Sequence, residues 1–292
     1  MTSPPFAPAV FALPAVRTVA ELRARVRTWR AKGERVGLVP TLGALHEGHL
    51  SLVRRARQGA DRVIASVFVN PAQFAAGEDF EAYPRDEARD AELLASVGCD
   101  LLYAPTAEAM YPEGFSTTVT VTGVSDSMEG AARPTHFAGV ATVVAKLLIQ
   151  AAPDIAVFGE KDYQQLQVIR RMVRDLDLPV EVIGAPTVRA QDGLALSSRN
   201  AYLSETERAI AGRLNVVLAE AAAALADGAA VGAVEAQAIR LLLDAGFDRI
   251  DYLETRDADD LRRLGPGPVD APARILAAAT IGRTRLIDNM PI

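Results

Sequence analysis

The chain has 292 residues, half of them hydrophobic, with a formal net charge of −6 and one cysteine, Cys99. This length predicts two domains or one large one. The net negative charge argues against a protein that coats nucleic acid. A single cysteine excludes an internal disulfide, which suits a reducing compartment. Cys99 itself is interpreted as a small apolar residue at the start of a buried strand, with a nucleophile as the less favoured alternative.

The N-terminal residues 1–16 are apolar but contain four prolines and no basic start, so they do not predict a signal peptide. The longest apolar run, 140–152, includes Lys146 and is shorter than the ~20 residues that a membrane span needs. We therefore expect a soluble cytoplasmic protein with no membrane partner.

Short apolar strands alternate with amphipathic helices through the first two thirds of the chain. The predicted strands are 35–40, 61–70, 100–105, 154–159 and 179–186. The predicted helices are 49–58, 85–98 (with Gly98 as its C-cap), 137–152 and 163–176. This order predicts an α/β fold with a Rossmann-like, doubly wound parallel sheet, in which ligands bind beyond the carboxyl ends of the strands.

The pattern changes near Pro186. A polar loop begins at residue 187 and leads into a helix whose start is marked by the capping-box pair Ser204 and Glu207. Two alanine-rich helical stretches follow to about Leu243, and strands are predicted at 248–257, 273–282 and 284–289. We expect a larger domain over 1–187 and a smaller α+β domain over 188–292.

Two histidines, His46 and His49, stand three residues apart with Gly48 between them. A helical zinc-protease motif needs a spacing of four, and a zinc site needs three or four ligands. The remaining candidates, His136, Cys99 and scattered carboxylates, show no ligand spacing. A zinc site is therefore the less favoured interpretation.

The surroundings of the histidine pair favour phosphate binding instead. A strand ends at Val39, a turn follows, and a helix opens near His46. Helix N-termini attract phosphate, and an imidazole there can donate to phosphate oxygens as charge builds in a transition state. Two surface histidines at a helix start remain the alternative.

The histidine motif H-x-G-H is that of the nucleotidylyltransferase superfamily. The longer strings PTLGALHEGH, SVFVNPAQF, YPR, RPTHFAGV, FGEKDYQQL and LALSSRNAYLS follow in order. Together they resemble the pantothenate synthetase (pantoate–β-alanine ligase) family over nearly the whole chain. The resemblance implies that ATP adenylates (R)-pantoate and releases pyrophosphate, and that β-alanine then attacks the pantoyl adenylate to give pantothenate and AMP. It also implies a homodimer, magnesium with the ATP, and a smaller domain that acts as a lid.

By the same resemblance, three segments and one further residue bind ATP: Pro40, Thr41, Leu42, Gly43, Ala44, Leu45, His46, Glu47, Gly48 and His49; Gly159, Glu160, Lys161 and Asp162; Val188; and Leu196, Ser197, Ser198 and Arg199. His49 is the implied proton donor, and His46, Lys161, Ser197, Ser198 and Arg199 complete the catalytic set. Lys161, one of three lysines in the chain, can meet phosphate oxygens as a point charge, although a solvated loop lysine is the alternative. Asp162 either caps the next helix or binds the nucleotide.

Gln73 and Gln165 match the pantoate-binding glutamines of the family, and Asn70 and His136 are expected in the same pocket. Neutral amides suit a carboxylate that must act as a nucleophile, because they orient it without withdrawing its charge. The alternative for each is a satisfied polar residue beside a loop.

The chain departs from the family pattern at Leu42 and Leu196, where methionine is usual; both keep an apolar residue of similar volume. The acidic residues Asp86, Glu87 and Asp90 are available near the expected metal side, but none is assigned as a ligand. Three other functions stay open: a different adenylate transferase, which needs a cationic pocket in place of the glutamines; a zinc metallohydrolase using His46, His49 and His136; and a catalytically silent nucleotide-binding protein.

Overall fold

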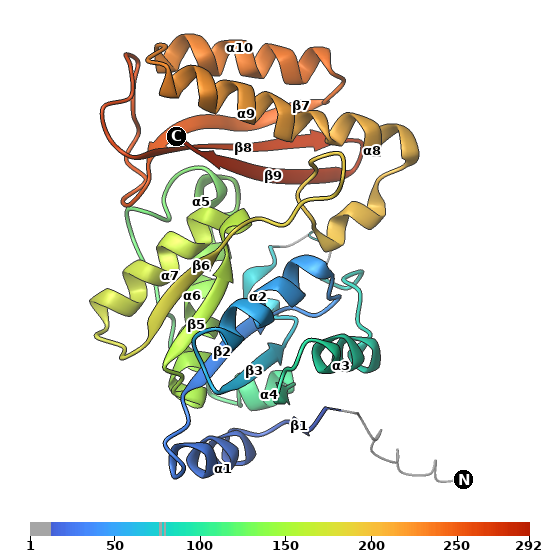
Figure 1. The fold of residues 1–292 in the computed structure, drawn as a ribbon, viewed down its shortest axis with the longest axis vertical. Helices are drawn as coiled ribbons and strands as arrows, with labels where there is room; N and C mark the ends of the chain where they lie inside the picture. The colour runs from blue at the N-terminus through green and yellow to red at the C-terminus, as the bar shows by residue number, and fades with distance from the viewer. Residues whose placement is uncertain (1–12, 76–77, 79) are drawn as a thin grey trace.

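The computed structural model describes residues 13–75, 78 and 80–292, which form two β-sheets (Figure 1). Residues 1–12, most of the segment predicted not to be a signal peptide, lie outside the described residues. The larger sheet is parallel, with the order β1–β4–β3–β2–β5–β6. Its strands are β1 (Ala15–Val16), β2 (Val36–Thr41), β3 (Arg62–Val67), β4 (Leu101–Tyr103), β5 (Ile155–Gly159) and β6 (Glu181–Ala185).

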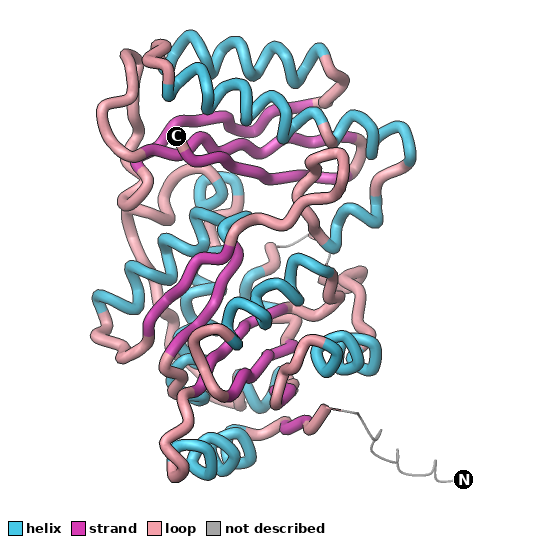
Figure 2. The backbone as a smooth tube through the Cα atoms, viewed as in Figure 1, coloured by secondary structure: helices cyan, strands magenta, loops and turns pink. Residues whose placement is uncertain are grey.

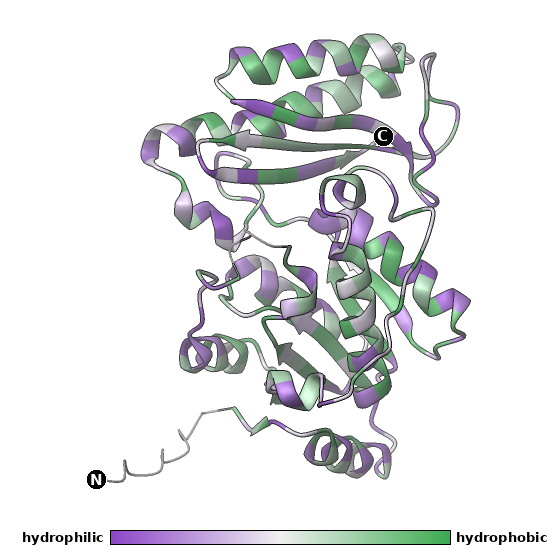
Figure 3. Ribbon diagram, turned by 180° about the vertical axis from the view of Figure 1, so that it is seen from behind, coloured by the Kyte–Doolittle hydropathy of each residue, from purple (hydrophilic) through white to green (hydrophobic). Residues whose placement is uncertain are grey.

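Helices alternate with these strands along the chain (Figure 2) and cover both faces of the sheet. One face carries α1 (Val19–Arg30), α6 (His136–Ala151) and α7 (Tyr163–Asp175), and the other carries α2 (Glu47–Arg57) and α3 (Glu87–Ser96). The strands are apolar on both sides, as a covered parallel sheet requires, and they are mostly green in the hydropathy view (Figure 3). The predicted doubly wound α/β architecture is confirmed.

The order of the strands reverses at β2, which lies between β3 and β5. Gly37 on β2 pairs with Val63 on one side and with Ile155 on the other. In such sheets the crevice for ligands opens beyond the carboxyl ends of the two strands that flank the reversal. Here β2 ends at Thr41 and β5 ends at Gly159, so the histidine segment and the lysine segment leave the sheet side by side.

The smaller sheet is antiparallel, with the order β7–β8–β9. Its elements are β7 (Arg249–Asp257), β8 (Ala273–Ile281) and β9 (Thr284–Pro291), with α9 (Arg213–Ala226) and α10 (Val231–Asp244) packed on one face. The short helix α8 (Glu205–Ala211) precedes them and begins with the predicted Ser204–Glu207 capping box. The smaller α+β unit is therefore also as predicted.

Several helical features differ from the prediction, among them the short helices α4 (Ala107–Met110) and α5 (Glu129–Ala132), which were not predicted. Helix α1 is absent from the predicted elements, although Thr18 and Glu21 form a capping box at its start. Within the described residues, the helical stretch long and apolar enough to cross a membrane is Glu205–Ala226, not 140–152. Leu214, Leu218 and Leu225 of that stretch are buried in the core of the small sheet. These three leucines therefore belong to the core of the smaller unit.

Polar contacts join the other face of the small sheet to segments that surround the large sheet. The Arg285 guanidinium donates to both carboxylate oxygens of Glu129, at 2.9 and 2.5 Å, and the Tyr252 hydroxyl donates to the same carboxylate at 3.0 Å. Arg274 on β8 donates to Glu160 at 3.0 Å. Glu129 is only 6% exposed, and a buried carboxylate needs a partner. Arg285 of the small sheet supplies the opposite charge.

Candidate active site

A cavity of about 1310 Å³ opens between the carboxyl ends of the large sheet and the inner face of the small sheet. Ligand pockets usually measure ~300–1,000 Å³, so this one has room for a nucleotide and a second ligand. Most of the predicted site residues line it: Pro40, Thr41, Leu42, His46, Gly48, His49, Gln73, His136, Gly159, Lys161, Asp162, Gln165, Val188, Leu196, Ser197, Ser198 and Arg199. Six predicted residues are not among the lining residues: Gly43, Ala44, Leu45, Glu47, Glu160 and Asn70.

A left-handed turn leads from β2 into the histidine segment. Gly43 has φ +83° and Ala44 has φ +51°, a region that favours glycine and is strained for alanine. The Asp90 carboxylate, 2% exposed, accepts the Ala44 and Leu45 amides at 3.0 and 2.8 Å. Burial raises the pKa of Asp90, although these two amides oppose the shift. The turn residues thus shape the loop from behind the cavity wall.

His46 and His49 lie together at the start of α2. Their ring centroids are 4.1 Å apart. His46 Nδ1 accepts the Gly48 amide at 3.1 Å, and His49 Nδ1 accepts the His46 amide at 3.3 Å. Each Nδ1 is therefore an acceptor, which places the proton of the neutral ring on Nε2. A Cβ at Gly48 would lie 2.8 Å from the His46 ring, so the glycine permits this packing.

Both histidines are neutral near pH 7. Burial lowers the pKa of His46 to about 4, and the positive charge of Lys161 adds to the effect. Burial and the neighbouring His46 lower the pKa of His49 to about 3. The pair therefore offers two Nε2–H donors in place of two cations.

Lys161 and Asp162 occupy the short turn η2 (Glu160–Asp162) between β5 and α7. The Lys161 ammonium lies 3.4 Å from the Asp162 carboxylate. Burial raises the pKa of Asp162, but the combined effect of Lys161, His136 and Arg199 is larger and lowers the pKa on balance. Asp162 is the N-cap residue of α7, yet its side chain accepts no capping hydrogen bond. The suggestion that it caps this helix is therefore wrong, and its carboxylate faces the cavity.

The neighbouring acidic residues point elsewhere. Glu160 is paired with Arg274 of the small sheet, and Glu47 forms an exposed pair with Arg54. Their side chains are therefore already engaged, in contrast to the nucleotide contacts that the resemblance implied.

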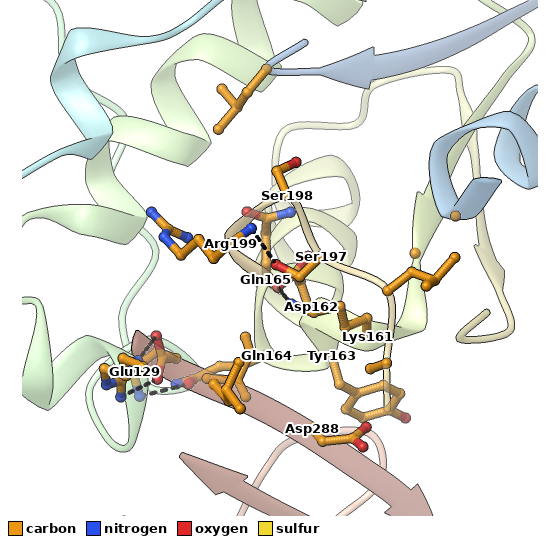
Figure 4. A pocket seen from close by; sticks show the side chains of 18 of the residues that line it. Glu129, Lys161, Asp162, Tyr163, Gln164, Gln165, Ser197, Ser198, Arg199 and Asp288 are labelled. Atoms are coloured by element: carbon orange, nitrogen blue, oxygen red, sulfur yellow. Dashed lines mark hydrogen bonds and ion pairs between the residues drawn. The ribbon is translucent and has the colours of Figure 1, made fainter. Parts of the chain in front are cut away.

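The segment from Val188 to Arg199 crosses from the large sheet to the small one. The Leu196 amide donates to the Val188 carbonyl at 2.9 Å, which closes a small hairpin. Ser197 Oγ accepts the Arg199 amide at 3.3 Å, and Ser198 Oγ donates to the Ala44 carbonyl at 3.1 Å. Figure 4 shows Ser197, Arg199, Gln165 and Asp162 gathered around the same part of the cavity. The third predicted segment thus meets the first two.

The predicted pantoate side holds Gln73, His136 and Gln165 at the cavity wall. His136 Nδ1 lies 2.9 Å from the Gln73 carbonyl oxygen, and burial lowers the pKa of His136. Asn70 is fully buried: its amide donates to Gln73 Oε1 at 3.2 Å, and its oxygen accepts the Tyr111 hydroxyl at 2.8 Å. The expectation that Asn70 lines the pocket is therefore corrected, because it lies behind Gln73.

Adjacent glutamines on α7 have separate surroundings. Gln164 is 3% exposed and donates to the Val124 and Ser127 carbonyls at 2.9 and 2.8 Å. Both glutamines line the cavity, but Gln165 is partly exposed, whereas the amide hydrogens of Gln164 are already used by these two carbonyls. Of the two, Gln165 is therefore the one that can turn its amide toward a bound carboxylate in the way the resemblance implied.

The acidic residues near the expected metal side all have protein partners. Asp86 caps α3 by accepting the Arg89 amide at 3.1 Å, Glu87 pairs with Arg17 at 2.6 Å, and Asp90 binds the turn amides. Across residues 13–75, 78 and 80–292, no three histidine, cysteine, aspartate or glutamate side chains gather in a way that could hold a metal ion. A zinc site built on the histidine pair therefore has no support among these residues.

Cys99 is buried just before β4, and burial raises the pKa of its thiol to about 11. A thiol that stays protonated is a poor nucleophile, in agreement with its interpretation as a packing residue.

Several cavity residues are missing from the prediction: Glu129, Arg133, Tyr252, Arg285 and Asn289. Arg133 stands within the quoted string RPTHFAGV, so that motif could have indicated it. The others come from the small sheet or from the segment that meets it. They make contacts with residues more than 100 positions away in the sequence; Glu129 and Arg285, for example, are 156 positions apart. No local sequence pattern reveals such contacts.

Comparison with known proteins gives a consistent result. A sequence model of the pantoate–β-alanine ligase family matches residues 14–291. A pantothenate synthetase from Caulobacter vibrioides is 66% identical over 278 residues, covering 95% of this chain and 98% of its own. The corresponding protein of Mesorhizobium japonicum is 58% identical, with 95% of this chain and 97% of its own covered.

Solved structures agree with the sequence comparison. A pantothenate synthetase from Thermus thermophilus superimposes with a TM-score of 0.89 at 50% identity, covering 95% of this chain and 99% of its own. A pantoate–β-alanine ligase from Francisella tularensis, complexed with β-γ ATP and β-alanine, gives a TM-score of 0.80 at 32% identity, with 96% and 98% covered.

Proposed function

The chain belongs to the pantoate–β-alanine ligase family and joins pantoate to β-alanine at the expense of ATP, and from this premise we propose which of its residues carry each step. The reaction proceeds through pantoyl adenylate. The observation that carries the assignment is the convergence of three segments on one cavity: the histidine pair, Lys161 and the segment 196–199. Hydrogen-bond donors and cations gathered at the switch point of a parallel sheet suit a triphosphate.

In the first step a pantoate carboxylate oxygen attacks the α-phosphorus of ATP, and the bond to the bridging oxygen breaks as pyrophosphate leaves. We assign the Nε2–H groups of His46 and His49 to phosphate oxygens, because both rings are neutral and fixed by backbone amides. His49 thus serves as a hydrogen-bond donor in the resting protein. Lys161 and Arg199 supply positive charge, and Ser197 a hydroxyl, where charge develops.

The turn before the histidine pair is held in place without contacting the nucleotide in this proposal. It is formed by Gly43, Ala44 and Leu45, and Ser198 contacts it. The Ala44 peptide is held on one side by Asp90 and on the other by Ser198. Thr41, Leu42, Val188 and Leu196 contribute the walls of the nucleotide site. Asp162 accepts from the ribose hydroxyls or from the nucleotide.

Gln165 and Gln73 orient pantoate, with His136 beside them. In the second step the free amine of β-alanine attacks the acyl carbon of pantoyl adenylate. The bond between acyl carbon and phosphate oxygen breaks, AMP leaves, and the new amide loses one proton. Residues of both sheets line the cavity, so closure of the small sheet over it would keep bulk water from the reactive intermediate.

Magnesium enters this proposal as the complex with ATP. Mg²⁺ is usually held by one or two carboxylates, substrate phosphates and water, and Asp162 is the predicted site carboxylate that faces the cavity. Bound there, the ion would neutralise phosphate charge. The steps above do not depend on which protein group contacts it.

We further propose a division into a catalytic domain, 1–187, and a lid, 188–292, and a cytoplasmic homodimer. The division is supported by the two sheets, whose cores are largely distinct, although Leu261 and Leu276 of the smaller unit pack into the core of the larger one. The dimer is the expectation for the family, and Phe115 and Ile149, which are 37% and 56% exposed, are two large apolar side chains that a partner subunit could cover. Light scattering at micromolar concentration measures the mass and tests the dimer.

The decisive experiment measures pyrophosphate release from ATP with and without pantoate and β-alanine. We expect release that requires pantoate, with AMP and pantothenate appearing only after β-alanine is added. Release without pantoate, or none from folded protein, would contradict the two-step assignment.

A further inference from the structure

Asn289, on the last strand of the chain, reaches from the small sheet to the turn that carries Lys161. Its side-chain nitrogen donates to the Glu160 carbonyl at 2.9 Å and to the Lys161 carbonyl at 3.0 Å. Asn289 is 4% exposed and pairs with Leu276 on the central strand β8. The two hydrogens of the Asn289 amide thus bond to two consecutive carbonyls of the turn that follows β5 in the large sheet.

The turn has little local support. Gly159, the N-cap residue of η2, has no side chain that could cap it, and the side chain of Asp162, the N-cap residue of α7, makes no capping hydrogen bond. The Lys161 ammonium contacts Asp162 at 3.4 Å, a distance at which a hydrogen bond is weak. The position of the ammonium therefore depends on the position of its own backbone, and Asn289 holds that backbone.

A second residue of the small sheet holds the same turn by its side chain. Arg274, on β8, donates to the Glu160 carboxylate at 3.0 Å, and its guanidinium stacks on the Tyr163 ring at 3.9 Å. The turn is therefore held from both sides of Lys161, and both contacts come from the small sheet. Lys161 is close enough to the histidine pair to lower the pKa of His46.

We propose that Asn289 is a positioning residue for Lys161: it sets the lysine for phosphate transfer only when the small sheet is docked on the large one. The inference rests on the phosphate-binding role proposed for Lys161. It goes beyond that role because it makes adenylation depend on a side chain placed on the other sheet, 128 residues from Lys161.

The test is a double-mutant cycle in the full chain, read as the single-turnover rate of pantoyl adenylate formation with enzyme in excess. The variants are Asn289→Leu, which keeps the branched shape, Lys161→Ala, and the two together. Asn289→Asp, also of the same shape, replaces Asn289→Leu if thermal unfolding shows that the leucine variant does not fold. Gln167→Leu is the matched control, because Gln167 is 4% exposed and donates to the Ala258 carbonyl at 3.0 Å across the same interface without touching the lysine turn.

We expect Asn289→Leu to lower the adenylation rate roughly 10- to 100-fold, the range typical of a misplaced catalytic group, with the KM for ATP changed much less. In the Lys161→Ala background it should add less than about twofold, because residues that act through one another are not additive. Gln167→Leu should stay within about twofold of wild type, because Gln167 does not contact the turn that carries Lys161.

Equal losses from Asn289→Leu in both backgrounds would overturn the proposal, and so would an equal loss in the Gln167→Leu control. A wild-type rate in Lys161→Ala would instead remove the role proposed for the lysine itself. A slow Lys161→Ala with an additive Asn289→Leu would leave that role intact and refute only the positioning role.

Discussion

Ser198 Oγ donates a hydrogen bond of 3.1 Å to the main-chain carbonyl of Ala44, across 154 residues of sequence. The Ala44 amide is held by Asp90 at 3.0 Å, so this left-handed peptide is fixed at both ends. The contact joins the segment that leads to the small sheet with the turn that precedes the histidine pair. Ser198 therefore joins the two loops that we propose to meet at the nucleotide phosphates.

Ser198→Ala should slow adenylation by about 2- to 10-fold, because a net hydrogen bond is worth about 1 kcal/mol. The fold should be retained, since neither loop depends on this bond alone. Pantoate-dependent pyrophosphate release measures the effect. Ser204→Ala is the control: it removes the α8 capping box and should lower the free energy of unfolding by about 1 kcal/mol without changing the rate. An unchanged rate in Ser198→Ala would show that the loops need no such contact.

Protein stability should depend on the two neutral histidines below neutral pH. Their folded pKa values, about 4 and about 3, lie below the unfolded value near 6.5. The unfolded chain therefore binds more protons between about pH 6.5 and 3, so their contribution is complete above pH 6.5 and is lost as the pH falls. His49→Gln should unfold in urea with a smaller dependence on pH between 7 and 5 than wild type. Equal slopes in the two proteins would contradict the neutral state.

The buried pair between Glu129 and Arg285 should matter for stability. Removing one partner of a buried pair leaves an uncompensated charge and costs about 3–5 kcal/mol. We expect Arg285→Met to lower the free energy of unfolding by about 3 kcal/mol, the lower end of that range, because Arg133 also lies 4.0 Å from Glu129. Arg174→Met removes an exposed pair with Asp175 and should cost less than about 1 kcal/mol. Similar effects of the two changes in chemical denaturation would show that the interface pair is not a determinant of stability.

Gln165→Leu should weaken the binding of pantoate. The amide of Gln165 faces the cavity, and its loss should raise the KM for pantoate by about 10-fold or more, since a site built to hydrogen-bond a ligand depends strongly on that bond. The KM for ATP should change little. Gln167→Leu, two residues along the same helix but directed at Ala258, serves as the comparison. If the KM for pantoate is unchanged in Gln165→Leu, the pantoate pocket lies elsewhere.

Leu42→Met and Leu196→Met should each leave the adenylation rate within about twofold of wild type. Both side chains line the cavity, and the exchange conserves apolar volume. Steady-state kinetics at saturating and limiting ATP would detect any difference. A large gain in either variant would show that methionine sulfur contributes to nucleotide binding.

Much of the fold could be predicted from local patterns. The apolar runs at 35–40 and 154–159 are β2 and β5 because buried parallel strands need apolar residues on both faces. Helix α1 shows where this approach falls short: Leu22 and Val26 are its buried residues, among many arginines, so its apolar stripe is thin. The Thr18 capping box was the usable signal.

The candidate site divides in the same way. His46, Lys161 and Ser197 belong to short motifs that follow strands or precede helices, so their neighbourhood could be inferred. Asn289 and Arg285 lie in an ordinary alternating strand, and their contacts are with residues of the other sheet's unit, far away in the sequence. Asp162 was misjudged as a possible cap because the sequence pattern of a cap does not reveal which way the carboxylate turns.

In the described part of the chain, the backbone passes from the large sheet to the small one once, between Ala185 at the end of β6 and Ser204 before α8. Ser197, Ser198 and Arg199 lie on this tether. Any rotation of the small sheet must therefore also move these three residues, which we propose to lie beside the departing pyrophosphate. Opening of the cleft would therefore also loosen the proposed contacts with that product, and a glycine insert that lengthens the tether should separate the two effects.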